Sequence, residues 1–101
     1  MHIFDLKNMP SHPYAERQKN VFFQQEEFKA RIIDLKPGGE MPTCKMESYV
    51  MFYVISGIAQ VMVNQESVEL SEGHCLITEP ATLAMKTQNG VRMMGIQISK
   101  L

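Results

Sequence analysis

Apolar and polar residues alternate along most of the chain in short segments, many of them rich in β-branched and aromatic residues. Alternation with a period of two is typical of β-strands, in which successive side chains point to opposite faces. Glycine, proline, asparagine and serine stand between the segments and favour turns. Strands are predicted at residues 2–6, 20–25, 28–36, 41–46, 49–55, 58–64, 66–70, 75–79, 82–87 and 91–100.

This density of strands leaves little of the chain for helices. The best helical candidate is residues 14–18, which is too short to shape the fold. Many short strands separated by turns predict an all-β sandwich or barrel. We expect a single domain over residues 1–101, in which residues 1–28 supply N-terminal strands and an arm and residues 29–101 form the barrel.

The predicted strand at residues 49–55 is apolar on both faces. One face carries Val50, Phe52 and Val54, and the other carries Tyr49, Met51, Tyr53 and Ile55. A strand of this kind has to be covered on both sides. One face would line the barrel and a second copy of the chain would cover the other, so we expect a homodimer. In the alternative, the N-terminal segment at residues 2–7 covers the outer face within one chain.

Charge and composition narrow the classes of partner. The formal net charge is −1 and no run of like charge occurs, which argues against nucleic acids and anionic membranes as partners. The first residues lack the apolar stretch of a secretory signal, and no segment approaches the roughly 20 apolar residues of a membrane span. A cytoplasmic location is therefore expected. There, Cys44 and Cys75 would be free thiols.

Two sets of spaced residues carry a family resemblance. The first set is Gly38, Cys44, Met46, Val50 and Gly57, and the second is Gly73, Pro80, Thr82, Met85 and Asn89. Their spacings resemble the two motifs of the cupins, the small jelly-roll barrels also called RmlC-like, with one extra residue before Pro80 and threonine in place of a glycine at Thr82. The resemblance runs from Lys29 to the end of the chain and implies a cupin-like double-stranded β-helix.

The positions that bind metal in the cupins are all changed. In that family two histidines and a glutamate of the first motif and a histidine of the second bind a divalent ion. Here Cys44, Met46, Val50 and Met85 occupy those positions. None of the family's ligands can be carried over, so we expect no metal and no other cofactor, and we assign no catalytic residue.

The substituted residues allow three interpretations. Methionine and free cysteine behave as adaptable apolar side chains, so they could simply fill the barrel. They could instead line an apolar ligand pocket, with Arg92 or Gln60 at its mouth. The residues of that pocket would be Cys44, Met46, Val50, Phe52, Val54 and Met85. In the third interpretation, the sulfur atoms of Cys44, Met46 and Met85 form a soft site suited to Cu(I).

The expected function is therefore the non-catalytic binding or sensing of a small, largely apolar molecule by a metal-free barrel. One alternative is a copper-binding protein or a metal-dependent enzyme that uses Cys44, Met46 and Met85. Another is a purely structural dimeric barrel that acts through its outer face. His12 would reach the mouth of the barrel only if the N-terminal arm folds back.

Overall fold

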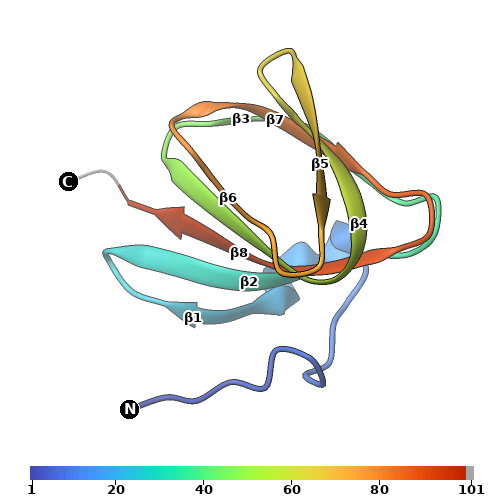
Figure 1. Cartoon of the computed structure of the whole chain (residues 1–101). Helices are drawn as coiled ribbons and strands as arrows, with labels where there is room; N and C mark the ends of the chain where they lie inside the picture. Colours follow the sequence, from blue (N-terminus) through green and yellow to red (C-terminus); the bar gives the residue numbers. More distant parts are fainter. Residues whose placement is uncertain (100–101) are drawn as a thin grey trace.

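An eight-stranded antiparallel sheet curls into a barrel, as Figure 1 shows. The computed structural model describes residues 1–99. A 3-10 helix, η1 (Tyr14–Asn20), precedes the strands β1 (Val21–Gln24), β2 (Phe28–Leu35), β3 (Glu40–Met46), β4 (Tyr49–Val63), β5 (Glu66–Ser71), β6 (Cys75–Thr78), β7 (Ala81–Lys86) and β8 (Val91–Ile98). The prediction of an all-β barrel is confirmed. The end of the last predicted strand, Lys100, lies outside the described residues.

The strands follow the order β1-β2-β8-β4-β7-β3, and β5 and β6 also pair with β4. The first half of β4 pairs with β6 and β8, and its second half pairs with β5 and β7. Strand β4 therefore passes from one side of the barrel to the other. We predicted two strands with a turn between them, and the structure has one bent strand.

The bend in β4 lies at Gly57, where the register with β8 also shifts, between Val54 and Ser56. Gly57 has a φ of +86°, which favours glycine. A Cβ at this position would collide with the carbonyl oxygen of Gly90 and lie 2.8 Å from the Cα of Val91. The register shift leaves Ile55 as the extra residue of a bulge, and Gly57 allows β8 to approach closely just after it, so one strand continues where a turn was predicted.

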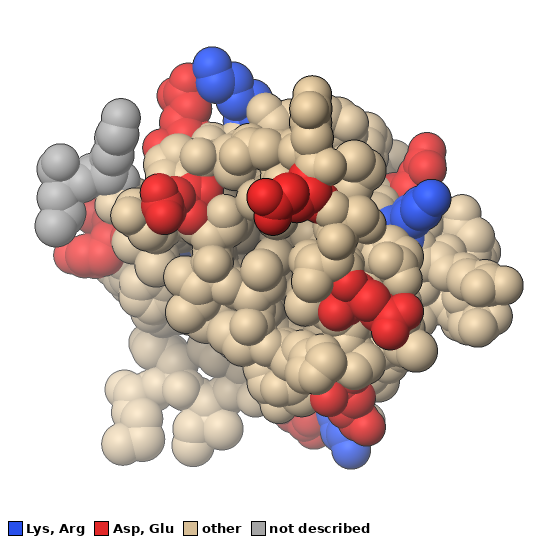
Figure 2. Space-filling view, turned by 45° about the horizontal axis from the view of Figure 1, so that its top comes forward, with Lys and Arg blue, Asp and Glu red and all other residues tan. Residues whose placement is uncertain are grey.

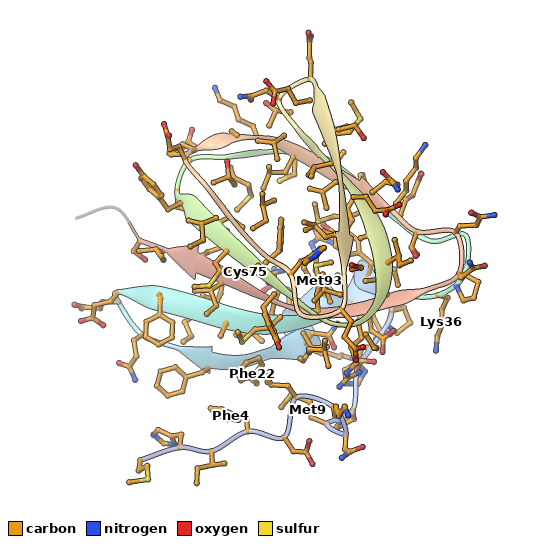
Figure 3. The ribbon with its side chains drawn as sticks, viewed as in Figure 1. Phe4, Met9, Phe22, Lys36, Cys75 and Met93 are labelled. Atoms are coloured by element: carbon orange, nitrogen blue, oxygen red, sulfur yellow. The ribbon has the colours of Figure 1, made fainter. Side chains whose placement is uncertain are left out.

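The N-terminal arm, residues 1–13, forms no strand, contrary to the prediction for residues 2–6. It runs beside β1 and β2, and Figure 3 shows Phe4 next to Phe22, with ring centroids 4.7 Å apart. Arg92 on the outer face of β8 donates hydrogen bonds to the carbonyl oxygens of Leu6 and Met9. The backbone groups of this segment are thus bound by a side chain and not by a neighbouring strand.

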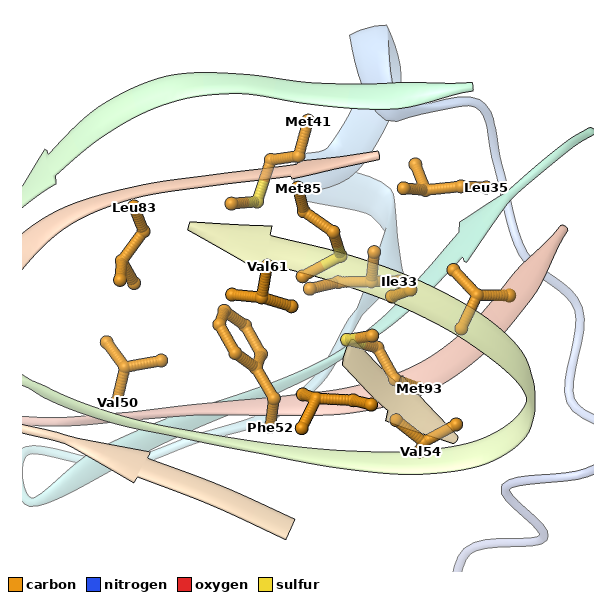
Figure 4. Close-up of a cluster of buried hydrophobic side chains, with 13 residues drawn as sticks. Ile33, Leu35, Met41, Val50, Phe52, Val54, Val61, Leu83, Met85 and Met93 are labelled. Carbon is orange, nitrogen blue, oxygen red and sulfur yellow. The ribbon is translucent and has the colours of Figure 1, made fainter. Parts of the chain in front are cut away.

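The core lies inside the barrel, where side chains of opposing strands meet (Figure 4). Its largest fully buried members include Leu83, Met93, Val54 and Val61. The periodicity of the strands explains this core, since every second residue of β4 from Val50 to Val54 points inward and is almost fully buried. No helix within residues 1–99 is long and apolar enough to cross a membrane.

Candidate functional site

A cavity of about 180 Å³ opens between the inner faces of the barrel strands. Its apolar wall is formed by Ile33, Leu35, Met41, Val50, Phe52 and Leu83. Figure 4 shows Val50 and Phe52 of β4 facing Leu83 of β7 across the interior. All six side chains are buried in the core, so the wall is apolar and closely packed. The barrel is therefore not filled completely by its own side chains.

The mouth of the cavity is polar and basic. On β2, Lys29 and Arg31 lie on the same face as Ile33 and Leu35, because residues two apart in a strand point to the same side. The inner face of this strand thus changes from apolar to cationic as it approaches the mouth. Gln97 of β8, directly opposite Lys29, completes this side.

The arm and η1 supply the other side of the mouth. His12, Tyr14, Arg17 and Asn20 all line the cavity, and Tyr14 also packs against the core. The side chain of the buried Asn20 accepts a hydrogen bond from the backbone N–H of His12, 2.7 Å, and donates one to its carbonyl oxygen, 2.9 Å. The arm therefore folds back, which is the condition under which His12 was expected to reach the mouth. The short helix predicted to have little effect helps to form the site.

Arg31 is the central charged group of the mouth. Its Nη2 donates a hydrogen bond to Oε1 of Gln97 at 3.0 Å. Burial lowers the pKa of Arg31 below its ordinary value, Arg17 lowers it further, and Tyr14 and Cys44 act in the opposite direction. Within residues 1–99 the ion pairs are Lys19–Glu16 and Arg92–Asp34, so no carboxylate of this part of the chain pairs with Arg31, Lys29 or Arg17.

The structure brings together four of the six residues of the predicted pocket. Cys44, Met46, Val50 and Phe52 line the cavity. Val54 and Met85 do not line it, because both are packed within the core, with 0% and 3% of their surface exposed. Met85 lies opposite Met41 and Val61 in the sheet, away from the mouth.

Arg92 and Gln60 are not at the mouth, and this prediction was wrong. Both lie on the outer face of the barrel, because they stand one residue out of phase with Val91, Met93, Ala59 and Val61 of the core. Arg92 pairs with Asp34 at 2.9 Å, and Gln60 donates a hydrogen bond to Glu69. In β2 the phase of Ile33 and Leu35 places Lys29 and Arg31 inside, but the opposite phase is apolar as well, so the sequence pattern left the inner face of this strand undecided. Nothing in the local sequence pattern shows that His12, Tyr14 and Arg17 reach the mouth, because their positions depend on how the arm and η1 fold.

The candidate metal ligands do not form a complete set. Cys44 Sγ lies 3.6 Å from Met46 Sδ, but Met85 belongs to the core and does not line the cavity. Val50 has no donor atom, and the described residues contain no group of three histidine, cysteine, aspartate or glutamate side chains placed to hold a metal. This donor set does not fit the hard or borderline divalent ions that the cupin resemblance implies.

Comparison with known proteins identifies the fold. No protein-family model matches the sequence, and no curated protein matches it. Among solved structures, the TT1209 protein of Thermus thermophilus is 21% identical, with a TM-score of 0.86 over 100% of both chains. A cupin superfamily protein of Desulfitobacterium hafniense is 11% identical, with a TM-score of 0.75 over 79% of this chain and 74% of its own.

An RmlC-like cupin family protein with a double-stranded β-helix fold, from Methanocaldococcus jannaschii, is 19% identical. Its TM-score is 0.72, over 78% of this chain and 76% of its own. At these identities the similarity concerns the fold. The resemblance inferred from the two sequence motifs is therefore confirmed, and this chain has the cupin double-stranded β-helix fold.

Proposed function

We propose that this protein binds a small, largely apolar molecule inside the barrel and performs no chemistry on it. The cavity between β2, β3, β4 and β7 is the observation that supports the proposal. Small-molecule sites are typically concave and mostly apolar, with a few polar groups that orient the ligand. Since fold alone does not define function, the proposal rests on the residues of the cavity.

The size of the cavity limits the ligand. A dry protein cavity of roughly 150 Å³ admits benzene. The cavity here is slightly larger, about 180 Å³, and accommodates one ring with a small substituent or a short branched chain. This volume includes the mouth around Arg31 and Lys29, so a larger molecule would protrude from the barrel.

Ligand-dependent thermal stability tests the proposal. A ligand that binds only the folded state raises Tm in a concentration-dependent way. Toluene is a suitable neutral probe, and we expect it to raise the Tm of the wild-type protein. Val50→Phe, which extends a side chain into the cavity, should remove this shift. A wild-type Tm that does not respond to toluene or to any member of a library of small neutral and charged aromatic compounds would refute the proposal.

We also propose that two copies of the chain associate through the outer face of β4, β6 and β8. Residues that pair directly in an antiparallel sheet lie on one face. This face carries Tyr49, Met51, Tyr53, Cys75, Ile77, Met94, Ile96 and Ile98. Tyr49, Tyr53, Ile77 and Ile98 are exposed, with Ile77 at 66%. The N-terminal arm is held against β1 and β8 and leaves these side chains open.

The chemistry of this face favours a second copy as its partner. None of its eight residues is charged, so nothing on it would recognise a charged protein or nucleic acid. An apolar sheet face related to itself by a two-fold axis is self-complementary, as in most homodimers. On the side of the molecule that Figure 2 shows, charged side chains are scattered and form no continuous basic patch.

A further inference from the structure

The mouth of the cavity contains more cationic donors than carboxylates of residues 1–99 pair with. Asp34, the one acidic residue among the described residues that line the cavity, has its side chain on the outer face of β2, where it accepts hydrogen bonds from Arg92 and Ser11. The amide of Asn20 is bound to the backbone of His12, and the oxygen of Gln97 accepts from Arg31. The side-chain oxygens of Asp34, Asn20 and Gln97 thus already accept hydrogen bonds.

The groups without a carboxylate partner are all positive. Arg31 makes one hydrogen bond, to Gln97, and retains further N–H donors, while Lys29 lies in the adjacent inward position of β2. Arg17 covers the ring of Tyr14, with Cζ 4.8 Å from the ring centroid. Burial of the Arg31 guanidinium lowers its pKa, and the charge of Arg17 adds a smaller contribution in the same direction, so an anion bound beside Arg31 would stabilise its charged form.

We propose that the ligand carries a single carboxylate, which Arg31 binds with support from Lys29, while its apolar body occupies the cavity behind. This inference rests on the proposed binding function and specifies the class of ligand. The planar fork of an arginine matches a carboxylate and can donate two parallel hydrogen bonds to it. The limited volume behind Arg31 favours a small aromatic or branched aliphatic acid over a larger amphiphile.

Three probes of similar shape separate the contributions of charge and apolar contact. Benzoate has the ring and the carboxylate, toluene has the ring alone, and benzylamine has a ring and a positive charge. Titration calorimetry of the wild-type protein should give an affinity for benzoate at least about tenfold higher than for toluene, as expected for one charge-assisted hydrogen-bond pair. Benzylamine should bind more weakly than toluene.

Variants of Arg31 test whether this side chain causes the preference for benzoate over toluene. Arg31→Met keeps the length of the side chain and should weaken benzoate binding by about 10- to 100-fold while leaving toluene binding within about threefold. Arg31→Lys should retain part of the preference, because a positive charge without the fork remains. Lys86→Met is the control, since it removes an exposed positive charge that does not line the cavity.

The outcomes distinguish this inference from the function on which it rests. If benzoate and toluene bind equally well, or if Arg31→Met binds benzoate as the wild type does, the carboxylate assignment is wrong and the apolar cavity stands. Tighter binding of phenylphosphonate than of benzoate would also overturn the assignment. If none of the probes binds, both the inference and the proposed function fail. Circular dichroism confirms beforehand that each variant is folded.

Discussion

Arg31 of β2 and Gln97 of β8 are joined by a 3.0 Å hydrogen bond inside the mouth of the barrel. Gln97 lies directly opposite Lys29 in the sheet, so its side-chain oxygen is close to the position proposed for the carboxylate of the ligand. Gln97→Glu would place a permanent carboxylate there. We expect this variant to lose its preference for benzoate while it still binds toluene, because the internal carboxylate occupies the same donors.

Titration calorimetry of Gln97→Glu with both probes measures this effect. Gln97→Met is the control, because it removes the hydrogen bond to Arg31 without adding a charge and should keep the preference for benzoate. Undiminished benzoate binding by Gln97→Glu would mean that the carboxylate of the ligand binds elsewhere.

Because only one of two valines of β4 lines the cavity, replacing each of them with phenylalanine should change the free energy of unfolding by different amounts. Val50 lines the cavity, whereas Val54, on the same face, is fully buried and does not. Val54→Phe should lower the free energy of unfolding by about 1–3 kcal/mol, because it overpacks a filled region. Val50→Phe should lower it by less than about 1 kcal/mol, because the new ring has space. Urea unfolding gives both values, and equal losses would show that the interior near Val50 is filled.

The close backbone packing at the bend of β4 predicts that replacing glycine with alanine costs more stability there than at a glycine of similar conformation elsewhere. Gly57 and Gly73 have nearly the same φ, +86° and +85°. A Cβ at Gly73 meets no atom within 4 Å, whereas at Gly57 it collides with the backbone at Gly90. Gly73→Ala should cost about 1 kcal/mol from the backbone conformation alone, and Gly57→Ala about 3 kcal/mol, because overpacking is added. A similar cost at both positions, measured by urea unfolding, would show that the contact at Gly57 relaxes freely.

The apolar outer face predicts the oligomeric state. Tyr53→Asp introduces a charge at the centre of this face and should convert a dimer into a monomer, because burying an unpaired carboxylate is unfavourable. Met62→Asp is the control, since Met62 has similar exposure, 42% against 38%, but lies beyond the bend of β4. Light scattering after size exclusion gives the masses. A monomeric wild-type protein, or a dimer that survives Tyr53→Asp, would contradict the proposed interface.

The separation of Met85 from Cys44 and Met46 predicts how the protein responds to soft metals. Two sulfur atoms 3.6 Å apart on one strand form an incomplete site. Protein loaded anaerobically with Cu(I) and then desalted should retain no stoichiometric copper by elemental mass spectrometry. One equivalent of copper that is lost in Cys44→Ser and retained in Met62→Leu would establish a copper site instead.

The sequence predicted most of the strands because their alternation is local. The inward positions of Val50, Phe52 and Val54 follow directly from the period of two. The continuity of β4 did not follow, because Ser56 and Gly57 are typical turn residues. Only their pairing with β8 and the close approach of Gly90 show that the strand continues through them. Residues 2–6 have the alternation of a strand because Phe4 packs on Phe22, although this segment does not pair with the sheet.

The candidate site was predicted in part. The cupin spacing located Cys44, Met46 and Val50 at the cavity, because the motif positions also define the inner face of the barrel. Arg31 and Lys29 share the phase of Ile33 and Leu35, but Ala30 and Ile32 on the opposite face of β2 are also apolar and buried, so alternation alone does not decide which face lies inside. The positions of His12 and Arg17 could not be predicted, because they depend on long-range contacts such as the hydrogen bonds between Asn20 of η1 and His12 of the arm.

The most direct test of the central claim is a methyl-labelled NMR titration of the wild-type protein with toluene. We predict saturable shifts of the methyl resonances of Val50, Leu83 and Ile33, which line the cavity, and much smaller shifts for Ile77 and Ile98 on the outer face. Saturable shifts confined to the outer face would contradict binding inside the barrel, and so would the absence of a saturable shift at any methyl group with both toluene and benzoate.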